Sequence, residues 1–395
     1  MSDVQTAPAR EGFPTARPDG FPASIMLSFL ATAGLFYVNI MAAIVDGLVS
    51  GLGLSDSAAG DIGAANIYGA AFGALIAVFF VKNVPWRPLA VICLLGLIAI
   101  DLGSIFITSA EVLILVRLAH GITGGLLVGV SYAVIARSGK VDRTFGVLLF
   151  VQFGLGGLGV MVLPRLVPIY GTAPLFLALA LFSAAALAML PFLDRYPPKK
   201  KLAIKHGGVA WTPLLMTLAA IFIFQAANMG LLAYIIRLGI DYGLERNYVS
   251  TALGLATWVA LAGPGVVIVV GKKYGRFPVL FAGMGLTLAG TAMFHLSAHP
   301  AAYMLANCGT GITWGAVMAY LLAMASQFDG AGRTAAAAGF VSKLGLASGP
   351  FAAGKLLAAG YGFSGLINAA LIGLALSTIV TLLPARRLDR EKTDG

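Results

Sequence analysis

Charged residues are scarce in this chain of 395 residues, because Asp, Glu, Lys and Arg together make up only 11% of the sequence. Hydrophobic residues make up 59%, and the mean hydropathy is +0.92. Both values lie outside the range of soluble globular proteins. The composition therefore excludes an ordinary soluble domain and predicts a membrane protein.

Cysteine and histidine are also rare, with two and four copies. Cys93 and Cys308 fall in different predicted membrane spans, so the sequence does not indicate a disulfide framework. His120 is the only histidine well inside a predicted helix, and the sequence shows neither a metal-ligand cluster nor a nucleophile–base set. We therefore expect no metal, no cofactor and no enzymatic activity.

Acidic residues are outnumbered by basic ones, 16 against 26, which gives a formal net charge of +10. Such an excess can indicate nucleic-acid binding, but most of these bases fall at the termini or in alternate loops. That alternation is typical of the positive-inside rule. It predicts a multi-pass membrane protein with both termini in the cytoplasm and no nucleic-acid partner. We expect the membrane to be the bacterial cytoplasmic membrane.

Apolar runs of about 20 residues are long enough to cross a hydrocarbon core of about 30 Å. Twelve such runs predict an all-α protein with spans at 24–48, 57–81, 88–107, 111–136, 144–169, 172–193, 212–236, 247–271, 278–296, 301–326, 334–358 and 362–384. The expected domains are a disordered cytoplasmic tail at 1–22, six-helix bundles at 23–193 and 212–385, a basic cytoplasmic linker at 194–211 and a cytoplasmic tail at 386–395.

The two halves share residues at a fixed offset of 190 positions. The segment Gly121-Ile122-Thr123-x-Gly125 returns as Gly311-Ile312-Thr313-x-Gly315. The other repeated residues are Gly73 with Gly263, Lys82 with Lys272, Pro88 with Pro278, Arg143-Thr144 with Arg333-Thr334, and Phe150-Val151 with Phe340-Val341. A common offset near half the chain length predicts two pseudo-symmetric halves rather than a solenoid.

The fourth predicted helix carries a charged motif that begins Arg117-Leu118-Ala119-His120-Gly121. On a helix, Arg117, His120, Gly121 and Gly124 share one face. The motif resembles the Arg-x-x-x-Gly pattern on the fourth helix of the Major Facilitator Superfamily, and the resemblance to that family's plan extends from about residue 24 to residue 385. It implies two six-helix halves around a cavity lined mainly by helices 1, 4, 7 and 10. It also implies alternating access and a role for Arg117 in proton coupling or in stabilising the cavity.

The other motifs of that family are incomplete here. Its loop between helices 2 and 3 reads Asp-Arg-x-Gly-Arg, whereas this chain has Lys82-Asn83-Val84-Pro85-Trp86-Arg87 in the first half. The second half has Lys272-Lys273-Tyr274-Gly275-Arg276, which keeps Gly and Arg but lacks the acid. The resemblance implies gating roles for Lys82, Arg87, Lys272, Lys273, Gly275 and Arg276, without the usual salt bridge.

Two glycine motifs invite functional interpretations. Gly154-x-Gly156-x-x-Gly159 matches a dinucleotide fingerprint, but it lies inside an apolar helix, where small residues allow close helix packing. The family's antiporter motif, Gly-x-x-x-Gly-Pro, is absent from the fifth helix and appears as Gly345-x-x-x-Gly349-Pro350 on the eleventh. We take this displacement as evidence against a drug antiporter.

Lys343 lies ten residues beyond Arg333, so its depth in the membrane is about 15 Å. A cation at that depth costs several kcal/mol unless it is paired or hydrated. It either pairs with an acid from a neighbouring helix or binds an anionic group such as a carboxylate or phosphate. Arg117 would supply a second positive charge, and two cations facing one cavity would favour an anionic substrate.

Three acids in the first half are candidates for carrying a proton, together with Arg117 and His120. Asp46 shares a helix face with Asn39 and is the strongest candidate. Asp61 fits a position at the membrane interface equally well. Asp101 falls on the third helix, which is peripheral in the family plan, and this favours a structural pair.

Neutral polar residues complete the predicted substrate site. They are Asn39, Gln152, Gln225, Asn228, Asn307 and Trp314. Asn307 occupies the position of Arg117 in the second half, so the two halves differ in charge. Each of these side chains would serve equally well in helix–helix hydrogen bonds, which contribute about 0.6 kcal/mol on average.

These observations favour a proton-coupled secondary transporter of a small organic anion, such as a monocarboxylate or aromatic acid. Its partners would be the substrate, protons and the lipid bilayer, and we expect a monomer. One alternative is proton-driven efflux of amphiphilic compounds, which would favour an acidic cavity. A second alternative is an uncoupled sensor or lipid flippase with the same fold.

Overall fold

The computed structural model describes residues 15–80, 84–194, 196, 211–270, 275–328 and 333–393, and its regular structure in these ranges is helical. Ten helices in these ranges are long and apolar enough to cross a membrane. The prediction of an all-α protein with many membrane-spanning helices is therefore confirmed.

The described residues of the first half form eight α-helices and one short 3₁₀-helix. They are α1 (Phe21–Ala33), α2 (Phe36–Asn39), α3 (Met41–Leu52), α4 (Asp56–Phe80), α5 (Trp86–Ser104), α6 (Ala110–Ile135), α7 (Val141–Tyr170), α8 (Ala173–Met189) and η1 (Leu190–Phe192). The first predicted span is broken into α1, α2 and α3. The break follows Gly34, where an added Cβ would collide with the backbone of Gly124 on α6.

The second half contains the remaining helices. They are α9 (Trp211–Ala233), α10 (Ile235–Asp241), α11 (Arg246–Val259), α12 (Ala262–Val270), α13 (Arg276–Met293), η2 (Phe294–Leu296), α14 (Pro300–Ala325), η3 (Ser326–Phe328), α15 (Arg333–Ala358) and α16 (Gly362–Thr393). The predicted span at 247–271 is divided between α11 and α12, just before Pro264, which cannot donate a backbone hydrogen bond. α16 continues to Thr393, so the segment expected to be a tail from residue 386 is helical up to that point.

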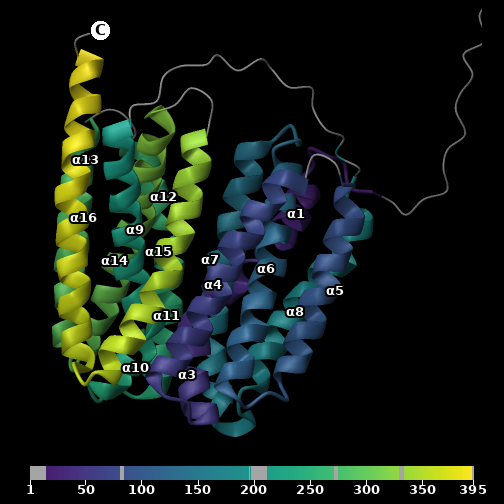
Figure 1. Cartoon of the computed structure of the whole chain (residues 1–395), viewed down its shortest axis with the longest axis horizontal. Helices are drawn as coiled ribbons and strands as arrows, with labels where there is room; N and C mark the ends of the chain where they lie inside the picture. Colours follow the sequence, from purple (N-terminus) through teal and green to yellow (C-terminus); the bar gives the residue numbers. More distant parts are fainter. Residues whose placement is uncertain are drawn as a thin grey trace, which may run out of the picture.

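Two groups of helices stand side by side in Figure 1, α1–α8 in purple through blue to teal and α9–α16 in teal through green to yellow. Between the groups, α4 packs along α15, α7 packs along α11, and α3 contacts α9 and α10. α3 and α10 meet at the end opposite to the C-terminus (Figure 1). We call this the far end, and we call the end at which α16 finishes the linker end.

Glycines allow α4 and α6 to approach each other closely within the first group. Cβ atoms at Gly73 on α4 and Gly125 on α6 would overlap the backbone of the opposite helix. Gly263, at the position of Gly73 in the sequence repeat, meets the carbonyl of Ile312 just as Gly73 meets that of Ile122. The repeated glycines are therefore positions of close helix packing, as small residues are in other membrane proteins.

The glycine motif of α7 also serves in packing. Cβ atoms at Gly156 and Gly157 would lie 3.1 Å from Asn39 Cβ and 2.5 Å from Trp258 Nε1. Trp258 donates a 3.0 Å hydrogen bond to the carbonyl of Gly154, so its indole links the two groups of helices.

Candidate functional site

A cavity of about 420 Å³ lies between the two groups of helices. This volume falls within the range of about 300–1,000 Å³ that is typical of small-molecule sites. Its lining comes from both groups, with α9, α11, α14 and α15 prominent in the second. Of the described residues on α6, the fourth predicted span, only Tyr132 lines the cavity, so that helix contributes less than the family resemblance implies.

Seven predicted substrate-site residues line this cavity. They are Asn39, Gln152, Gln225, Asn228, Asn307, Trp314 and Lys343. Sequence reasoning missed other polar lining residues, namely Tyr132, Thr257, Thr291, Thr310 and Ser342. For Thr310 the sequence did hold a signal, because it lies one turn after Asn307 and so shares its helix face.

Lys343 is the one charged residue among the described residues that line the cavity. No described residue forms an ion pair or hydrogen bond with its ammonium group. The interpretation of Lys343 as one half of a structural ion pair would require an acid beside it, and no described acid pairs with it. The cavity carries a positive charge that its described lining does not neutralise.

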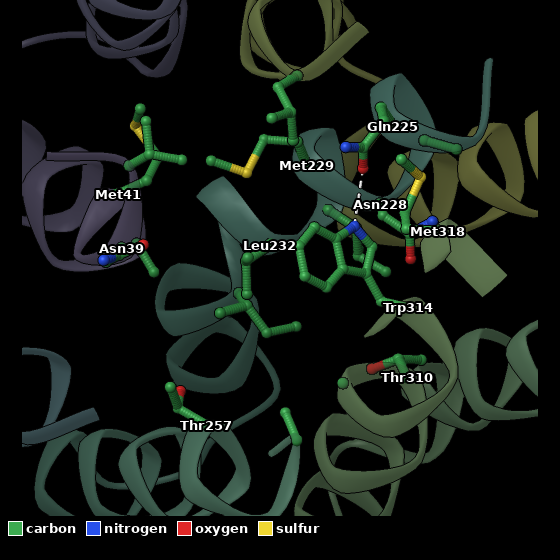
Figure 2. Close-up of a pocket in the computed structure, with 18 of the residues that line it drawn as sticks. Asn39, Met41, Gln225, Asn228, Met229, Leu232, Thr257, Thr310, Trp314 and Met318 are labelled. Atoms are coloured by element: carbon green, nitrogen blue, oxygen red, sulfur yellow. Dashed lines mark hydrogen bonds between the residues drawn. The ribbon is translucent and has the colours of Figure 1, made fainter. Parts of the chain in front are cut away.

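A chain of hydrogen bonds orders the polar side chains next to Lys343. Gln225 Nε2 donates to Ser342 Oγ over 2.8 Å, and Trp314 Nε1 donates to Gln225 Oε1 over 2.7 Å. Figure 2 shows the indole of Trp314 and the amide of Gln225 in this contact. Because Ser342 Oγ accepts from Gln225, its own proton remains available to a bound acceptor.

The asparagines of the cavity are tied to their own helices. Asn228 and Asn307 each donate a 2.8 Å hydrogen bond to the carbonyl four residues earlier, Phe224 and Tyr303. Asn39 has a buried Nδ2 with no partner among the described residues. Each amide therefore keeps hydrogen-bonding capacity for a ligand.

Apolar side chains cover the remainder of the cavity. Met41, Met229, Leu232 and Met318 surround the polar groups in Figure 2. The Phe153 ring lies with its centroid 6.3 Å from that of Trp314, within the range of aromatic pairs. Methionine side chains adapt to ligands of different shape. The cavity thus combines one cationic polar corner with a larger apolar space.

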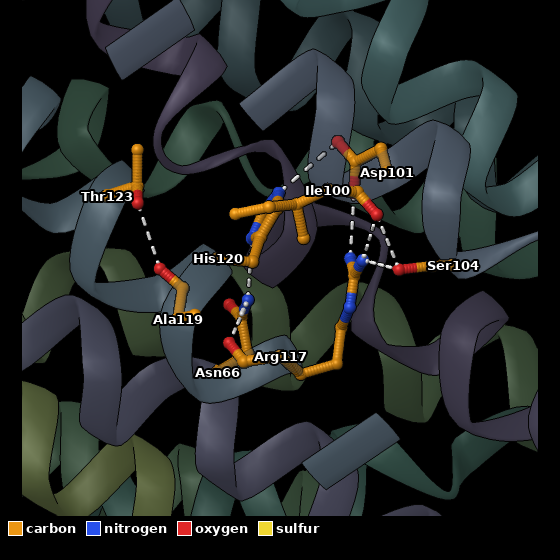
Figure 3. A network of polar contacts seen from close by, with 8 residues as sticks. All are labelled: Asn66, Ile100, Asp101, Ser104, Arg117, Ala119, His120 and Thr123. Carbon is orange, nitrogen blue, oxygen red and sulfur yellow. Dashed lines mark hydrogen bonds and ion pairs between the residues drawn. The ribbon is translucent and has the colours of Figure 1, made fainter. Parts of the chain in front are cut away.

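Arg117 does not line the cavity, contrary to our expectation. Its Nη1 lies 2.8 Å from Asp101 Oδ1, and both side chains are fully buried. Arg117 Nη2 also donates to Ser104 Oγ and, over 3.3 Å, to the carbonyl of Ile100 (Figure 3). We therefore withdraw Arg117 as a second cation for the substrate, because Asp101 neutralises its charge.

His120 belongs to the same buried network. Asn66 Nδ2 lies 2.7 Å from His120 Nδ1, and His120 Nε2 lies 3.3 Å from Asp101 Oδ2 (Figure 3). A neutral imidazole with its proton on Nε2 accepts from Asn66 and donates to Asp101, so it satisfies both contacts. Asp101 is thus shared by two partners, as the structural interpretation of this acid expects.

Asp46 and Asp61, the other two acids expected to carry a proton, do not line the cavity. Each forms an ion pair with a base of the second group at the far end, Asp46 with Arg246 and Asp61 with Lys355. Sequence analysis missed these partners. The signal was present, because these bases fall outside the alternate loops that hold most of the positive charge.

The expected gating residues are described only in part. Lys82, Lys272 and Lys273 lie outside the described residues. The Arg87 guanidinium donates to the carbonyl of Leu193 and lies 5.5 Å from the centre of the Trp86 ring.

In the second-half loop, the missing acid comes from a distant helix. Gly275 has a positive φ of 78°, which glycine adopts without strain, and it precedes the first residue of α13. The Asp389 carboxylate of α16 accepts hydrogen bonds of 2.8 Å from the backbone N–H groups of Arg276 and Phe277. An acid at the N-terminus of a helix satisfies free donors and complements the helix dipole.

The fold and the cavity define a multi-pass membrane protein built to hold a small molecule between two groups of helices. The sequence profile of the Major Facilitator Superfamily matches residues 25–350, and the chain belongs to that family. No curated protein matches the chain in sequence.

Two solved structures have a similar fold. A crystal structure of the nucleoside transporter NupG is 14% identical, with a TM-score of 0.70, and the alignment covers 92% of this chain and 98% of that one. A crystal structure of a D-xylose-proton symporter is 15% identical, with a TM-score of 0.69, covering 91% of this chain and 97% of that one. Family and fold together indicate a membrane transporter rather than an enzyme.

Proposed function

We propose that this chain is a proton-coupled secondary transporter of a small organic anion. Twelve spans would form two pseudo-symmetric six-helix bundles, residues 23–193 and 212–385, that alternately open the cavity to either side of the membrane. The segments 1–22, 194–211 and 386–395 would lie in the cytoplasm. The protein would work as a monomer in the bacterial cytoplasmic membrane. The recurrence of the Gly73–Ile122 contact as Gly263–Ile312 supports the duplicated architecture.

The observation that carries the anionic substrate is the unneutralised charge of Lys343. The ammonium group lines the cavity without a partner among the described residues, in surroundings of low polarity. Charged groups inside the membrane are rare, costly and usually functional. An anionic substrate would remove that cost on binding. Its attraction to the Lys343 ammonium would be stronger than in bulk water, because water is excluded from the cavity.

The arrangement around Lys343 favours an acid with an aromatic or other apolar body. A carboxylate would accept from the Lys343 ammonium and the Ser342 hydroxyl, whose proton is free because Gln225 occupies the oxygen. A ring attached to that carboxylate would reach the space near Trp314 and Phe153. Gln225 forms hydrogen bonds with both Ser342 and Trp314, so it would fix the position of the carboxylate site relative to the aromatic site.

Efflux of cationic amphiphiles is the alternative from the same class of transporter. A cation would require an acid in the cavity, and the described lining residues include none. Asp46 and Asp61, the acids of α3 and α4 that sequence analysis proposed, are paired at the far end. An uncoupled sensor or flippase would share the cavity but would show no dependence on a proton gradient.

Thermal stability in the presence of three ligands of similar shape would test the proposal. Benzoate, benzamide and benzylamine differ in charge, and a ligand raises the melting temperature of the state to which it binds. We expect stabilisation by benzoate alone, and none by benzoate in Lys343→Ala. Lys140→Ala, which removes an exposed lysine at the linker end, is the matched control. Stabilisation by benzylamine but not by benzoate would favour efflux of cations.

Concentrative uptake tests the coupling separately. In proteoliposomes, an imposed pH gradient should drive accumulation of radiolabelled benzoate beyond the passive accumulation that the same gradient produces in protein-free liposomes. A potential without a pH gradient and a collapsed gradient serve as further comparisons. If benzoate only equilibrates across the membrane under all conditions, proton coupling is wrong and an uncoupled sensor or flippase is favoured.

A further inference from the structure

Among the described residues, three ion pairs join the two groups of helices, and all have the same polarity. Asp46 pairs with Arg246, Asp56 with Arg237 over 2.6 Å, and Asp61 with Lys355 over 2.7 Å. Each acid belongs to the first half, on α3 or α4, and each base belongs to the second half, on α10, α11 or α15. The paired charges at the far end therefore divide between the halves, with the acids on the first and the bases on the second.

Further contacts close this end around the ion pairs. Tyr234 donates a 2.5 Å hydrogen bond to the carbonyl of Asp56, and Lys355 Nζ donates a 2.8 Å hydrogen bond to Ser57 Oγ. Gly60 meets both Tyr234 and the backbone of Pro350 at a separation that excludes a Cβ. The two halves are thus in direct contact at the far end.

The cavity reaches the opposite end of the bundle. Its lining includes Tyr132 on α6 and Leu322 on α14. These residues lie within one turn of the last residues of their helices at the linker end, Ile135 and Ala325. The structure therefore represents a state that is closed at the far end, with the cavity extending toward the linker end.

Asp46 differs from the other two acids in its burial. Its side chain is fully buried, whereas Asp56 and Asp61 are 26% and 24% exposed. Oδ2 bonds Arg246, and Oδ1 has no partner among the described residues. Removing one member of a buried ion pair leaves an uncompensated charge, so the pair with Asp46 should matter more than the exposed pairs.

We infer that the three ion pairs form a latch that closes the far end, and that protonation of Asp46 releases it. The inference rests on the proposed proton coupling for the source of the proton, but closure by the latch requires only the observed contacts. A proton from water adds to Oδ1 of Asp46, giving a neutral carboxylic acid while Arg246 keeps its charge. The ion pair becomes a weaker hydrogen bond, and the closed state loses stability relative to the open one. By linkage, protons bind preferentially to the state that is open at the far end.

The other charged groups around Asp46 support this assignment. Arg246 of α11 and Arg237 of α10 are the nearby cations, and Tyr303 of α14 is the neighbouring titratable group. On α4, which packs against α3, Asp56 and Asp61 are already paired.

The remaining helices that pack against α3 add few titratable groups. Arg165 of α7 donates to the carbonyl of Asn247 over 3.1 Å and to Thr251 Oγ1, and Tyr37 of α2 packs against His120. α8 and α9 contain no charged residue.

Distances between spin labels at each end of the full-length protein would test the latch without any substrate. Labels at Thr108→Cys and Ala298→Cys report the far end, and labels at Lys140→Cys and Gln327→Cys report the linker end, in a background with Cys93→Ala and Cys308→Ala. All four labelled positions are exposed. Asp46→Asn should lengthen the far-end distance and shorten the linker-end distance, shifting the ratio of open to closed populations by about tenfold or more. Acidic pH should have the same effect on the wild-type chain.

Control variants separate the latch from general damage and from the proposed substrate. The double variant Asp46→Arg with Arg246→Asp should restore closure, which a merely misfolded protein would not do. Asp61→Asn, at an exposed pair, should have a smaller effect, and Lys343→Ala should respond to pH like the wild type. If Asp46→Asn and Arg246→Gln leave both distances at their wild-type values, or if acid does not move the wild type, the latch is wrong. Loss of benzoate binding with an intact pH response would instead contradict only the anionic substrate.

Discussion

Arg117 and Asp101 form an ion pair in which both side chains are fully buried, and the cavity lies elsewhere. The residue with the strongest sequence motif thus neutralises an acid of a neighbouring helix. The family resemblance places it in proton coupling or in stabilising the cavity, whereas its contacts join α5 to α6 and favour a structural role away from the cavity.

Asp101→Asn should therefore act mainly on stability. The change would leave the Arg117 guanidinium buried without its counter-charge and should lower the free energy of unfolding by about 3–5 kcal/mol. Thermal melting of the purified protein would measure the loss. Ser104→Ala removes a neutral partner from the same guanidinium and should cost less. A normal melting temperature with abolished uptake in Asp101→Asn would show that the network acts in coupling instead.

Gly121→Ala should disturb the contact between α4 and α6. The added Cβ would overlap the carbonyl oxygen of Asn66, and the backbones would have to separate. Overpacking of this kind costs about 1–3 kcal/mol. Gly146→Ala is the matched control, because no atom lies within 4 Å of a Cβ at that position. Equal melting temperatures for the two variants would contradict the close packing.

Asp389→Ala should weaken the start of α13. It removes the acceptor for the N–H groups of Arg276 and Phe277, and loss of a helix cap costs about 0.5–2 kcal/mol. Asp389→Asn keeps one acceptor oxygen and should fall between the alanine variant and the wild type. Hydrogen exchange of the first turn of α13 would detect the change, and unchanged protection in Asp389→Ala would show that this cap contributes nothing.

Asp46→Asn should separate coupling from exchange. A permanently neutral side chain takes up no proton, so a pH gradient should no longer drive accumulation, whereas exchange of labelled for unlabelled substrate should continue. Both assays use the same proteoliposomes, and Asp61→Asn provides the comparison. Concentrative uptake by Asp46→Asn at the wild-type level would transfer the coupling role to another acid.

The orientation of the chain is open to a labelling experiment in whole cells. A cysteine replacing Ser55 at the far end should react with a membrane-impermeant maleimide added outside, and one replacing Lys140 at the linker end should react only after lysis. The background would again lack Cys93 and Cys308. The reverse pattern would place the termini outside.

Much of the cavity was predictable from sequence, because polar residues inside apolar spans are few and costly. Seven of these, including Gln225, Trp314 and Lys343, do line the cavity. Pairing between helices was not predictable, since Asp46 meets Arg246 only when two distant spans are packed together. The acid missing from the loop before Arg276 was likewise supplied by Asp389, which is remote in sequence.

α15 carries the cavity lysine and the base of one latch pair on the same helix. Lys343 and Lys355 are twelve residues apart, so about 18 Å of helix joins the two ammonium groups. Pro350 lies between them and cannot donate a backbone hydrogen bond, and its carbonyl faces Gly60 of the opposite half. Any tilt of α15 against α4 would move the Lys343 ammonium group in the cavity and strain the contact between Lys355 and Asp61 at the same time. Communication between cavity and far end would then need no relay of intervening side chains.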